Sequence, residues 1–370
     1  MIHYVVGRNL GHLNKCVANL ARFAEISDEP VTVYAFKKSH EWLHSNFTHG
    51  KIERYINPQK KAETLLNAGL VMHDWRDEIR FLKKERTGTG PVIGGVYHSD
   101  LFDSEEDTEQ ARKFKRQIRG IARESTDIFF HINILQPEYV PQLSTCYVPI
   151  PIIARDITQS PEEVKKRLGL QKDEPFILIQ MGGGAGRFRY KFINEWYKKI
   201  DQIHVRPYRI VIGGQLEGGD FMFHDDRVRA PLFANGRNLI HAADLVISKP
   251  GMGILMDCIS TGTPLLALPA DTKEREAKNK MLRDLTGSDI CLADNRMTPR
   301  DLEVRIAELM SQKAHFTKTC RTVPVIGADV VAKSMNMLSG CTLKELPDVY
   351  REILKITPFS VPDQPPHPSR

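Results

Sequence analysis

Short apolar runs alternate with amphipathic stretches along almost the whole chain, and this alternation restricts the fold more than any other feature of the sequence. Strands that alternate with helices in this way are joined by right-handed crossovers into parallel sheets that are covered on both faces. We therefore predict an α/β protein of doubly wound, Rossmann-like domains. The expected strands are His3–Val6, Val31–Phe36, Leu70–His73, Val92–Val96, Ile128–Ile132, Cys146–Val148, Phe176–Met181, Tyr208–Gly214, Val228–Phe233, Leu245–Ser248, Pro264–Pro269 and Ile290–Ala293. The expected helices include Leu13–Phe23, Tyr190–Ile200, Asn238–Ala243, Ile254–Ser260 and Lys273–Leu285.

The length of the chain indicates two such domains. A chain of 370 residues exceeds the usual ~100–200 residues of one domain. Between the halves, Pro149-Ile150-Pro151 is followed by Ser160-Pro161, an N-cap with proline at the first helical position, which places a linker near 149–160. We expect an N-terminal domain at 1–155, a C-terminal domain at 156–340, and a C-terminal helix with a proline-rich tail at 341–370.

Composition excludes several other classes of protein. The chain is 41% apolar and 26% charged, which is typical of soluble globular proteins. No run of about 18 apolar residues predicts a transmembrane helix, and the N-terminal apolar stretch is too short for a signal peptide. Six cysteines without CxxC spacing fit neither a zinc site nor a disulfide framework. We expect a cytoplasmic enzyme, and its net charge of +6 hints at an anionic partner.

The strongest chemical signal is the segment Asp244-Leu-Val-Ile-Ser-Lys-Pro-Gly251-Met-Gly253, which precedes a helix carrying Asp257. A strand ends at Ser248, and a turn of small residues leads directly into a helix N-terminus. The free N–H groups and the dipole at such an end suit a diphosphate, and glycines let phosphate oxygens approach the main chain. Asp257, about one turn further on, can accept hydrogen bonds from two ribose hydroxyls. In the alternative interpretation, the glycines only turn the chain and Asp257 is a solvated helix residue.

Residues 176–310 resemble the C-terminal domain of GT-B glycosyltransferases, particularly the UDP-glycosyltransferase group that includes the peptidoglycan N-acetylglucosaminyltransferase. The shared pattern begins with a glycine-rich loop after the first strand, here Gly182-Gly-Gly-Ala-Gly186. It continues with Asn238 to Gly251, an acidic residue six positions later, Gly262-Thr-Pro264, and a stretch at 275–279 that is similar to Asp-Gln-x-x-Asn. The resemblance implies a GT-B fold, in which two Rossmann-like domains face a central cleft.

The resemblance also implies roles for individual residues. The ribose-binding carboxylate falls on Asp257, where the family more often has Glu, and the base contacts fall near Phe233. Glu276 stands where the family usually has Gln, which leaves the identity of the sugar open. The implied nucleotide-binding residues are Gly183, Gly184, Phe233, Gly251, Met252, Gly253, Ile254 and Asp257, and the implied donor-sugar residues are Glu274, Glu276 and Asn279.

A second motif, from Gly7 to Lys15, follows the first predicted strand and resembles the Gly-x-Gly-His turn that opens the N-terminal domain of the same superfamily. The turn places His12 at the carboxyl end of that strand, where open α/β sheets bind ligands. Histidine titrates near neutrality, so His12 is our candidate for the base that takes a proton from the acceptor hydroxyl. In the alternative interpretation, His12 caps the helix.

The other acceptor-side candidates are Gly11, His98, Asp100 and Arg187. His98 and Asp100 follow one predicted strand, and Arg187 lies just past the glycine-rich loop. His73, Asp74 and Asp77 follow another strand. We favour a structural or solvated role for these three residues, as for His98 and Asp100, and all of them are the first acceptor-side residues to test.

Two absences bear on the mechanism. The sequence has no Asp-x-Asp metal motif, so we expect no metal and no cofactor, with a UDP-sugar as co-substrate. It also lacks the Glu-x7-Glu pattern of retaining GT-B enzymes, which favours inversion.

The segment 112–123 contains six basic residues and no acid, interleaved with Phe114, Ile118 and Ile121. On a helix these residues form a basic and an apolar face, as on an ordinary surface helix. The alternative is contact with an anionic acceptor, either lipid-linked at a membrane surface or DNA.

The sequence predicts an inverting, metal-independent glycosyltransferase with a nucleotide-sugar donor and leaves its acceptor open. Two alternatives keep the donor site. One is a nucleotide-sugar hydrolase or 2-epimerase, and the other is a DNA base glycosyltransferase with a basic nucleic-acid-binding surface.

Overall fold

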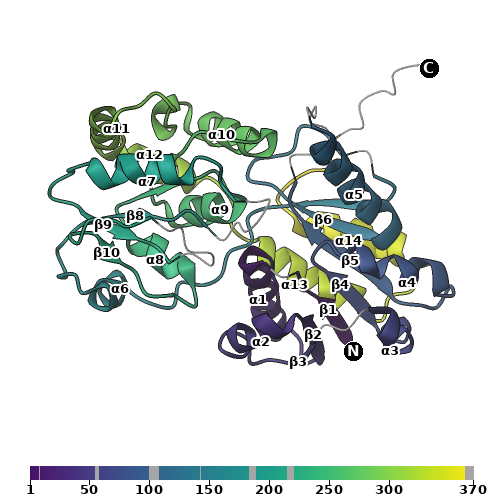
Figure 1. The fold of residues 1–370 in the computed structure, drawn as a ribbon. Helices are drawn as coiled ribbons and strands as arrows, with labels where there is room; N and C mark the ends of the chain where they lie inside the picture. The colour runs from purple at the N-terminus through teal and green to yellow at the C-terminus, as the bar shows by residue number, and fades with distance from the viewer. Residues whose placement is uncertain are drawn as a thin grey trace, which may run out of the picture. The chain divides into compact units, whose positions relative to one another are not determined.

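The computed structural model describes residues 1–7, 9–54, 58–99, 108–141, 143–182, 189–214 and 221–362. The chain forms two compact units (Figure 1): unit 1 comprises Met1–Arg155 and Pro324–Arg370, and unit 2 comprises Asp156–Val323. The C-terminal domain was expected to extend to residue 340, and this part of the prediction is wrong. Residues from 324 onward belong to unit 1 because the helix at Gly327–Leu338 packs against the first helix of the chain.

Among the described residues of unit 1, seven parallel strands form one sheet in the order β3-β2-β1-β4-β5-β6-β7. The chain starts in the middle of this sheet, adds β2 and β3 on one side, and then crosses back to add β4 beside β1. The strands are β1 (Ile2–Val5), β2 (Val31–Ala35), β3 (Lys51–Arg54), β4 (Leu70–His73), β5 (Val92–Tyr97), β6 (Ile128–Ile132) and β7 (Cys146–Ile150).

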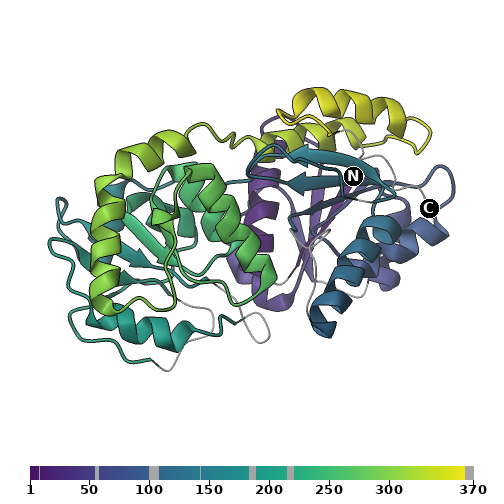
Figure 2. The ribbon, with the colours of Figure 1, turned by 90° about the horizontal axis from the view of Figure 1, so that it is seen from above.

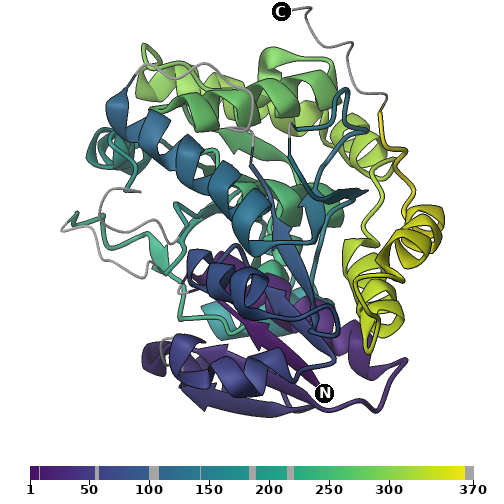
Figure 3. The same ribbon diagram turned by 90° about the vertical axis from the view of Figure 1, so that its right-hand side faces the viewer.

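Helices cover both faces of this sheet, as its fully buried strands require. Helices α3, α4 and α5 pack on one face, and α1, α13 and α14 on the other. The view in Figure 2 shows α13 and α14 in yellow lying over the strands of unit 1, and Figure 3 shows the same pair from the side. The helices are α1 (Leu10–Ala24), α2 (Lys37–His44), α3 (Ala62–Leu66), α4 (Arg80–Glu85), α5 (Glu109–Ser125), α13 (Gly327–Leu338) and α14 (Leu346–Ile356), with 3-10 turns η1 (Pro58–Lys61) and η2 (Asp77–Ile79).

Unit 2 repeats the topology with a smaller sheet. Its described strands are all parallel and follow the order β10-β9-β8-β11-β12, so β8 and β11 correspond to β1 and β4. Trp196 of α7 is fully buried against one face, together with apolar residues of α11. The elements are β8 (Phe176–Ile179), β9 (Arg209–Ile212), β10 (Val228–Arg229), β11 (Leu245–Ser248), β12 (Leu265–Ala267), α6 (Pro161–Leu168), α7 (Ile193–Gln202), α8 (Gly236–Ala242), α9 (Met252–Thr261), α10 (Lys273–Thr286), α11 (Pro299–Ser311), α12 (Lys313–Cys320) and η4 (Asp289–Cys291).

Two predicted strands differ from the structure, and one strand of the structure was not predicted. The segment Ile290–Ala293 was predicted as a strand, but its start belongs to the 3-10 turn η4, where the Ser288 side chain accepts the N–H of Ile290. Leu292 still joins the sheet through an isolated parallel bridge to Ala267. Strand β10 ends at Arg229, shortly before Pro231, which has no N–H to donate to a ladder. Strand β3, a partly exposed edge strand with little apolar content, was not predicted.

The basic segment forms helix α5, as expected. Its apolar residues Ile118, Ile121 and Ala122 are buried against Trp75 and Phe129 in unit 1. This packing accounts for the apolar face, and the role of the basic face stays a prediction. None of the helices in the described part of the chain is both long and apolar enough to cross a membrane.

Candidate active site

In unit 1, His12 and Asp74 meet between β1 and β4, where the order in which strands are added to the sheet reverses. Strands β1 and β4 are neighbours, with Val5 paired to His73, so the residues that follow these strands lie at the same edge. Helix α1 begins at Leu10, which places His12 in its first turn. There His12 Nδ1 contacts Oδ2 of Asp74 in a very short hydrogen bond. Ligands bind at this kind of topological switch point in open α/β sheets.

Lys15 shares the same carboxylate. Its Nζ lies 3.1 Å from Asp74 Oδ1 and forms an ion pair there. Burial by itself would raise the pKa of Asp74, but His12 and Lys15 together lower it to about 2, so the carboxylate is ionised. Asp74 and Lys15 are 1% and 5% exposed, whereas the His12 side chain is 23% exposed, so the histidine is the member of this group that solvent reaches most.

The turn that carries Asp74 is held rigidly. Trp75 has a φ of 57°, a left-handed conformation that is rare for a large residue and marks local strain. Burial lowers the pKa of His73 to about 4, so His73 is neutral, and its Nδ1 accepts the N–H of Arg76 at 2.9 Å. Trp75 stacks on Tyr97 with their centroids 5.0 Å apart. These contacts fix the position of the carboxylate beside His12.

The acceptor-side candidates lie near this pair or outside the described residues. His98 follows β5 and stacks on Tyr97 at 5.2 Å, and the Tyr97 ring also lies parallel to His12 at 6.5 Å. Gly11 precedes His12 in α1, and a Cβ there would meet no atom within 4 Å. Asp100 and Arg187 lie outside the described residues.

In unit 2, strands β8 and β11 meet at the corresponding switch point. Helix α9 follows β11 directly, and its N-cap is Gly251, so no side chain caps its first N–H groups. Gly251 adopts an extended conformation, Met252 is buried, Gly253 is exposed and Ile254 is half-buried. Among the described residues no side chain caps this helix end, and the N–H groups at a helix start are donors that suit an anion. Gly183 and Gly184, expected on the facing loop, lie outside the described residues.

Asp257 is half-buried on α9, and its charge acts on Arg237 of the neighbouring helix α8. Burial lowers the pKa of Arg237, and the Asp257 carboxylate opposes that effect. The guanidinium also donates from Nε to Oγ of Ser260 at 3.2 Å, which ties α8 to α9. Phe233 lies just before α8, buried beneath the guanidinium of Arg167 at 4.1 Å from its ring centroid.

Helix α10 carries the three donor-sugar candidates. Asn279 donates from Nδ2 to the carbonyl of Leu268 at 3.1 Å, and Glu274 forms an ion pair with Lys278. Glu276 is 65% exposed and pairs with Lys273. The structure therefore places Glu274 and Asn279 towards the interior and Glu276 on the surface.

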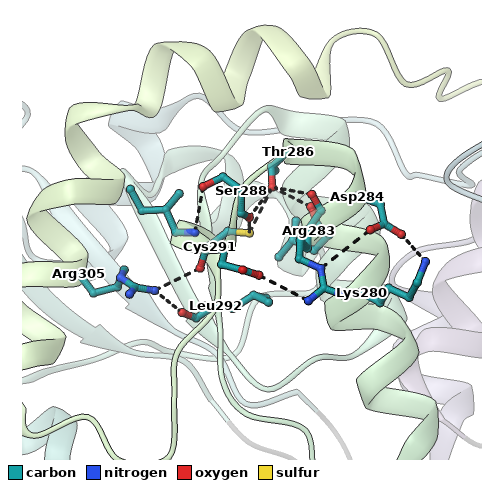
Figure 4. A network of polar contacts seen from close by, with 11 residues as sticks. Lys280, Arg283, Asp284, Thr286, Ser288, Cys291, Leu292 and Arg305 are labelled. Atoms are coloured by element: carbon teal, nitrogen blue, oxygen red, sulfur yellow. Dashed lines mark hydrogen bonds and ion pairs between the residues drawn. The ribbon is translucent and has the colours of Figure 1, made fainter.

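Figure 4 shows how the far end of α10 is fixed to the following turn. Thr286 donates to the carbonyls of Leu282 and Ser288, and Arg305 of α11 donates to the carbonyls of Asp289 and Leu292. The contacts hold the helix that carries Glu274 and Asn279 in a defined position.

The sequence did not predict three contacts of the candidate site. Asp74 binds His12, Lys15 forms an ion pair with Asp74, and Arg237 lies beside Asp257. The signal for Asp74 was present, because it follows the strand that adjoins β1 in a Rossmann-like sheet. The pairing requires the strand order, which a single sequence does not give.

Two Rossmann-like units with these switch points define the GT-B fold. Comparison with known proteins agrees with this class. Residues 221–324 match the glycosyltransferase family 28 C-terminal domain. Among solved structures, the chain is similar to the glycotransferase of kitacinnamycin (TM-score 0.64, 11% identity, covering 91% of this chain and 98% of that one). It is also similar to a UDP-glucosyltransferase from Polygonum tinctorium (TM-score 0.62, 11% identity, covering 96% and 98%).

Curated relatives are similar over part of their length. The UDP-N-acetylglucosamine--N-acetylmuramyl-(pentapeptide) pyrophosphoryl-undecaprenol N-acetylglucosamine transferase of Gloeothece citriformis is 23% identical over 213 residues, which are 56% of this chain and 57% of the relative. The enzyme of the same name from Prochlorococcus marinus is 29% identical over 143 residues, 37% and 38% of the two chains. The aligned region thus spans about half the length of these relatives or less. Together with the fold, these similarities place the chain in the GT-B glycosyltransferase superfamily.

Proposed function

We propose that this protein is an inverting, metal-independent glycosyltransferase that uses a UDP-sugar donor. The observation that carries the proposal is the hydrogen bond between His12 and a buried, ionised Asp74, because it gives unit 1 a base to complement the nucleotide site of unit 2. The match of residues 221–324 to a glycosyltransferase domain supports the donor class.

Unit 2 holds the nucleotide in this proposal. The first N–H groups of α9, which no side chain caps, bind the diphosphate, and Asp257 binds the ribose hydroxyls. The same N–H groups stabilise the negative charge that develops on the diphosphate as the bond to the sugar breaks. Phe233 lies beside the base, and Glu274 and Asn279 contact the sugar.

Unit 1 activates the acceptor. The ionised carboxylate of Asp74 accepts a hydrogen bond from the N–H at Nδ1 of His12. The other ring nitrogen, Nε2, therefore carries the lone pair and can take a proton. An acceptor hydroxyl gives its proton to Nε2 while its oxygen bonds to the anomeric carbon. The bond from that carbon to the diphosphate oxygen breaks, and UDP leaves with the electron pair. Asp74 stabilises the imidazolium and is a positioning residue.

A thermal-shift screen tests the donor site. We expect UDP and UDP-sugars to raise the melting temperature of the wild-type protein by mass action, and Asp257→Ala to lose most of this shift. The same measurement with dTDP and GDP identifies the nucleobase that the site prefers. If no nucleotide shifts the melting temperature, or the shift is the same in Asp257→Ala, the donor site is wrong.

An assay of donor turnover separates transfer from the hydrolase alternative. Steady release of free sugar from the donor alone, faster than transfer to any acceptor, would identify a hydrolase. If the protein binds DNA, and its affinity for DNA falls steeply as the salt concentration rises, a nucleic-acid acceptor is favoured instead.

A further inference from the structure

Lys249 lies at the junction of the two loops that follow β8 and β11. Gly182 follows β8, and Gly251 is the N-cap of α9. Ideal Cβ atoms on these two glycines would lie 3.9 Å and 4.0 Å from Lys249 Nζ. The ammonium is therefore flanked by backbone without side chains on both sides, and it lies beside the start of α9.

The carboxylates near Lys249 pair with other cations and not with the Lys249 ammonium. Arg275 and Lys278 are its cationic neighbours, and they form ion pairs with Asp271 and Glu274, respectively. The side-chain ammonium of Lys249 makes no hydrogen bond or ion pair with another residue in the described part of the chain; the Lys249 carbonyl accepts the hydroxyl of Ser248. Burial first, and then Arg275 and Lys278, lower the pKa of Lys249 to about 8, against the opposing effect of the two carboxylates.

A partly buried cation held near two other cations is unfavourable unless an anion joins it. A diphosphate at the start of α9 would supply that anion, because the glycines leave room for its oxygens beside Nζ. We propose that Lys249 binds the diphosphate of the nucleotide and stabilises the charge that develops on it as the sugar leaves. This inference rests on the proposed function, and it adds a charged side chain to a site that otherwise uses main-chain donors.

Calorimetric titration with uridine and UDP tests the proposal. We expect Lys249→Met to weaken UDP binding by about 10- to 100-fold, the range for a hydrogen bond to a charged group, and to leave uridine binding unchanged. Lys249→Arg should recover part of the lost affinity because it keeps the charge. Lys280→Met is the matched control, since it removes an exposed lysine of α10 that pairs with Asp284 and should change neither affinity.

The pH dependence of wild-type binding gives a second readout that needs no variant. Above about pH 7 the terminal phosphate of UDP is fully ionised. UDP affinity should therefore fall as the pH rises past about 8 and Lys249 loses its proton, while uridine affinity stays level. If UDP affinity is flat from about pH 7 to about pH 9.5, the role of Lys249 is refuted even if Lys249→Met does not fold.

The outcomes also separate this inference from the proposed function. A wild-type protein that prefers UDP to uridine, together with a Lys249→Met variant that keeps the same preference, refutes only the role of Lys249. A wild-type protein that binds neither ligand refutes the donor site, and the inference with it.

Discussion

The two units place different chemistry at the same point of the same topology. In unit 1, the switch point between β1 and β4 holds three ionisable side chains, His12, Asp74 and Lys15. In unit 2, the switch point between β8 and β11 holds a helix end without a side-chain cap, flanked by glycines. In the proposed function, one sheet edge moves a proton and the other holds an anion.

The difference shows what a Rossmann-like sheet supplies and what it leaves open. The strand order creates an opening at the carboxyl ends of two neighbouring strands, whatever residues follow. Gly251 at the N-cap places no side chain at the helix N-terminus, whereas α1, which starts at Leu10, carries His12 and Lys15 into the opening. Function is therefore set by the first turn after the strand, and not by the sheet.

The largest expected effect is on turnover, from His12→Gln. If His12 takes the acceptor proton, this variant should lose about 10²- to 10⁴-fold in kcat, the usual contribution of a general base. The affinity for UDP should not change, because His12 belongs to unit 1 and the nucleotide to unit 2. Product formation and UDP titration on the same preparation measure both quantities. Full activity in His12→Gln would remove the proton-transfer role from unit 1.

The second effect is on stability at acidic pH, from the buried carboxylate. The pKa of Asp74 is about 2 in the folded protein against 3.8 for an unperturbed aspartate, so ionised Asp74 stabilises the fold above about pH 4. This contribution is on the order of 2 kcal/mol and should be lost as the pH falls from about 4 to about 2. Urea unfolding of the wild type and of Asp74→Asn across this range measures it.

The two proteins in that experiment should converge at low pH. At pH 7 Asp74→Asn leaves the buried ammonium of Lys15 without its counter-charge and should be clearly less stable than the wild type. Exposed Asp348, paired on the surface with Arg351, provides the control, and Asp348→Asn should follow the wild type at every pH. If the difference in the free energy of unfolding between Asp74→Asn and the wild type is the same at every pH, the charge of Asp74 does not stabilise unit 1.

The two switch points also differ in how far the sequence predicts them. The glycines and the helix start of unit 2 are contiguous, from Ser248 to Asp257, so a single segment is enough to predict a candidate site there, and its nucleotide-binding role stays a prediction. The pair in unit 1 joins His12 to Asp74, which are 62 positions apart. Asp74 was therefore interpreted as structural, since only the pairing of β1 with β4 brings it to His12.

The errors in the fold have a similar origin. Alternating apolar runs predicted the buried strands well, because burial on both faces leaves a clear pattern. Strand β3 at the sheet edge has no such pattern. Ile290–Ala293 has the pattern but starts in a turn that Ser288 caps, so it joins the sheet through an isolated bridge at Leu292. The return of the chain to unit 1 through α13 depends on packing against α1, which no local pattern shows.

The third effect is on nucleotide affinity, from Asp257→Ala. Loss of a carboxylate that accepts from ribose hydroxyls should weaken both UDP and uridine by about 10- to 100-fold. The two ligands should be affected equally, because both contain the ribose. Asp284 of α10 is exposed, and Asp284→Ala should bind both ligands as the wild type does. If uridine affinity is unchanged in Asp257→Ala, the carboxylate does not contact the ribose.

The smallest effect should come from a single methyl group at the start of α9. Gly251 has a φ of −130°, which any residue adopts, and a Cβ there would meet its nearest atoms at 3.9 Å and 4.0 Å. Gly251→Ala should therefore change the free energy of unfolding by no more than about 0.5 kcal/mol. The same methyl group would stand where phosphate oxygens approach the main chain, so UDP affinity should fall several-fold while uridine affinity holds. In the corresponding first turn of unit 1, a Cβ at Gly11 would meet no atom within 4 Å, and Gly11→Ala should leave UDP affinity unaltered. Equal UDP affinity in Gly251→Ala and Gly11→Ala would show that the glycine of unit 2 serves the turn alone, and the contrast between the two helix starts would then rest on their side chains.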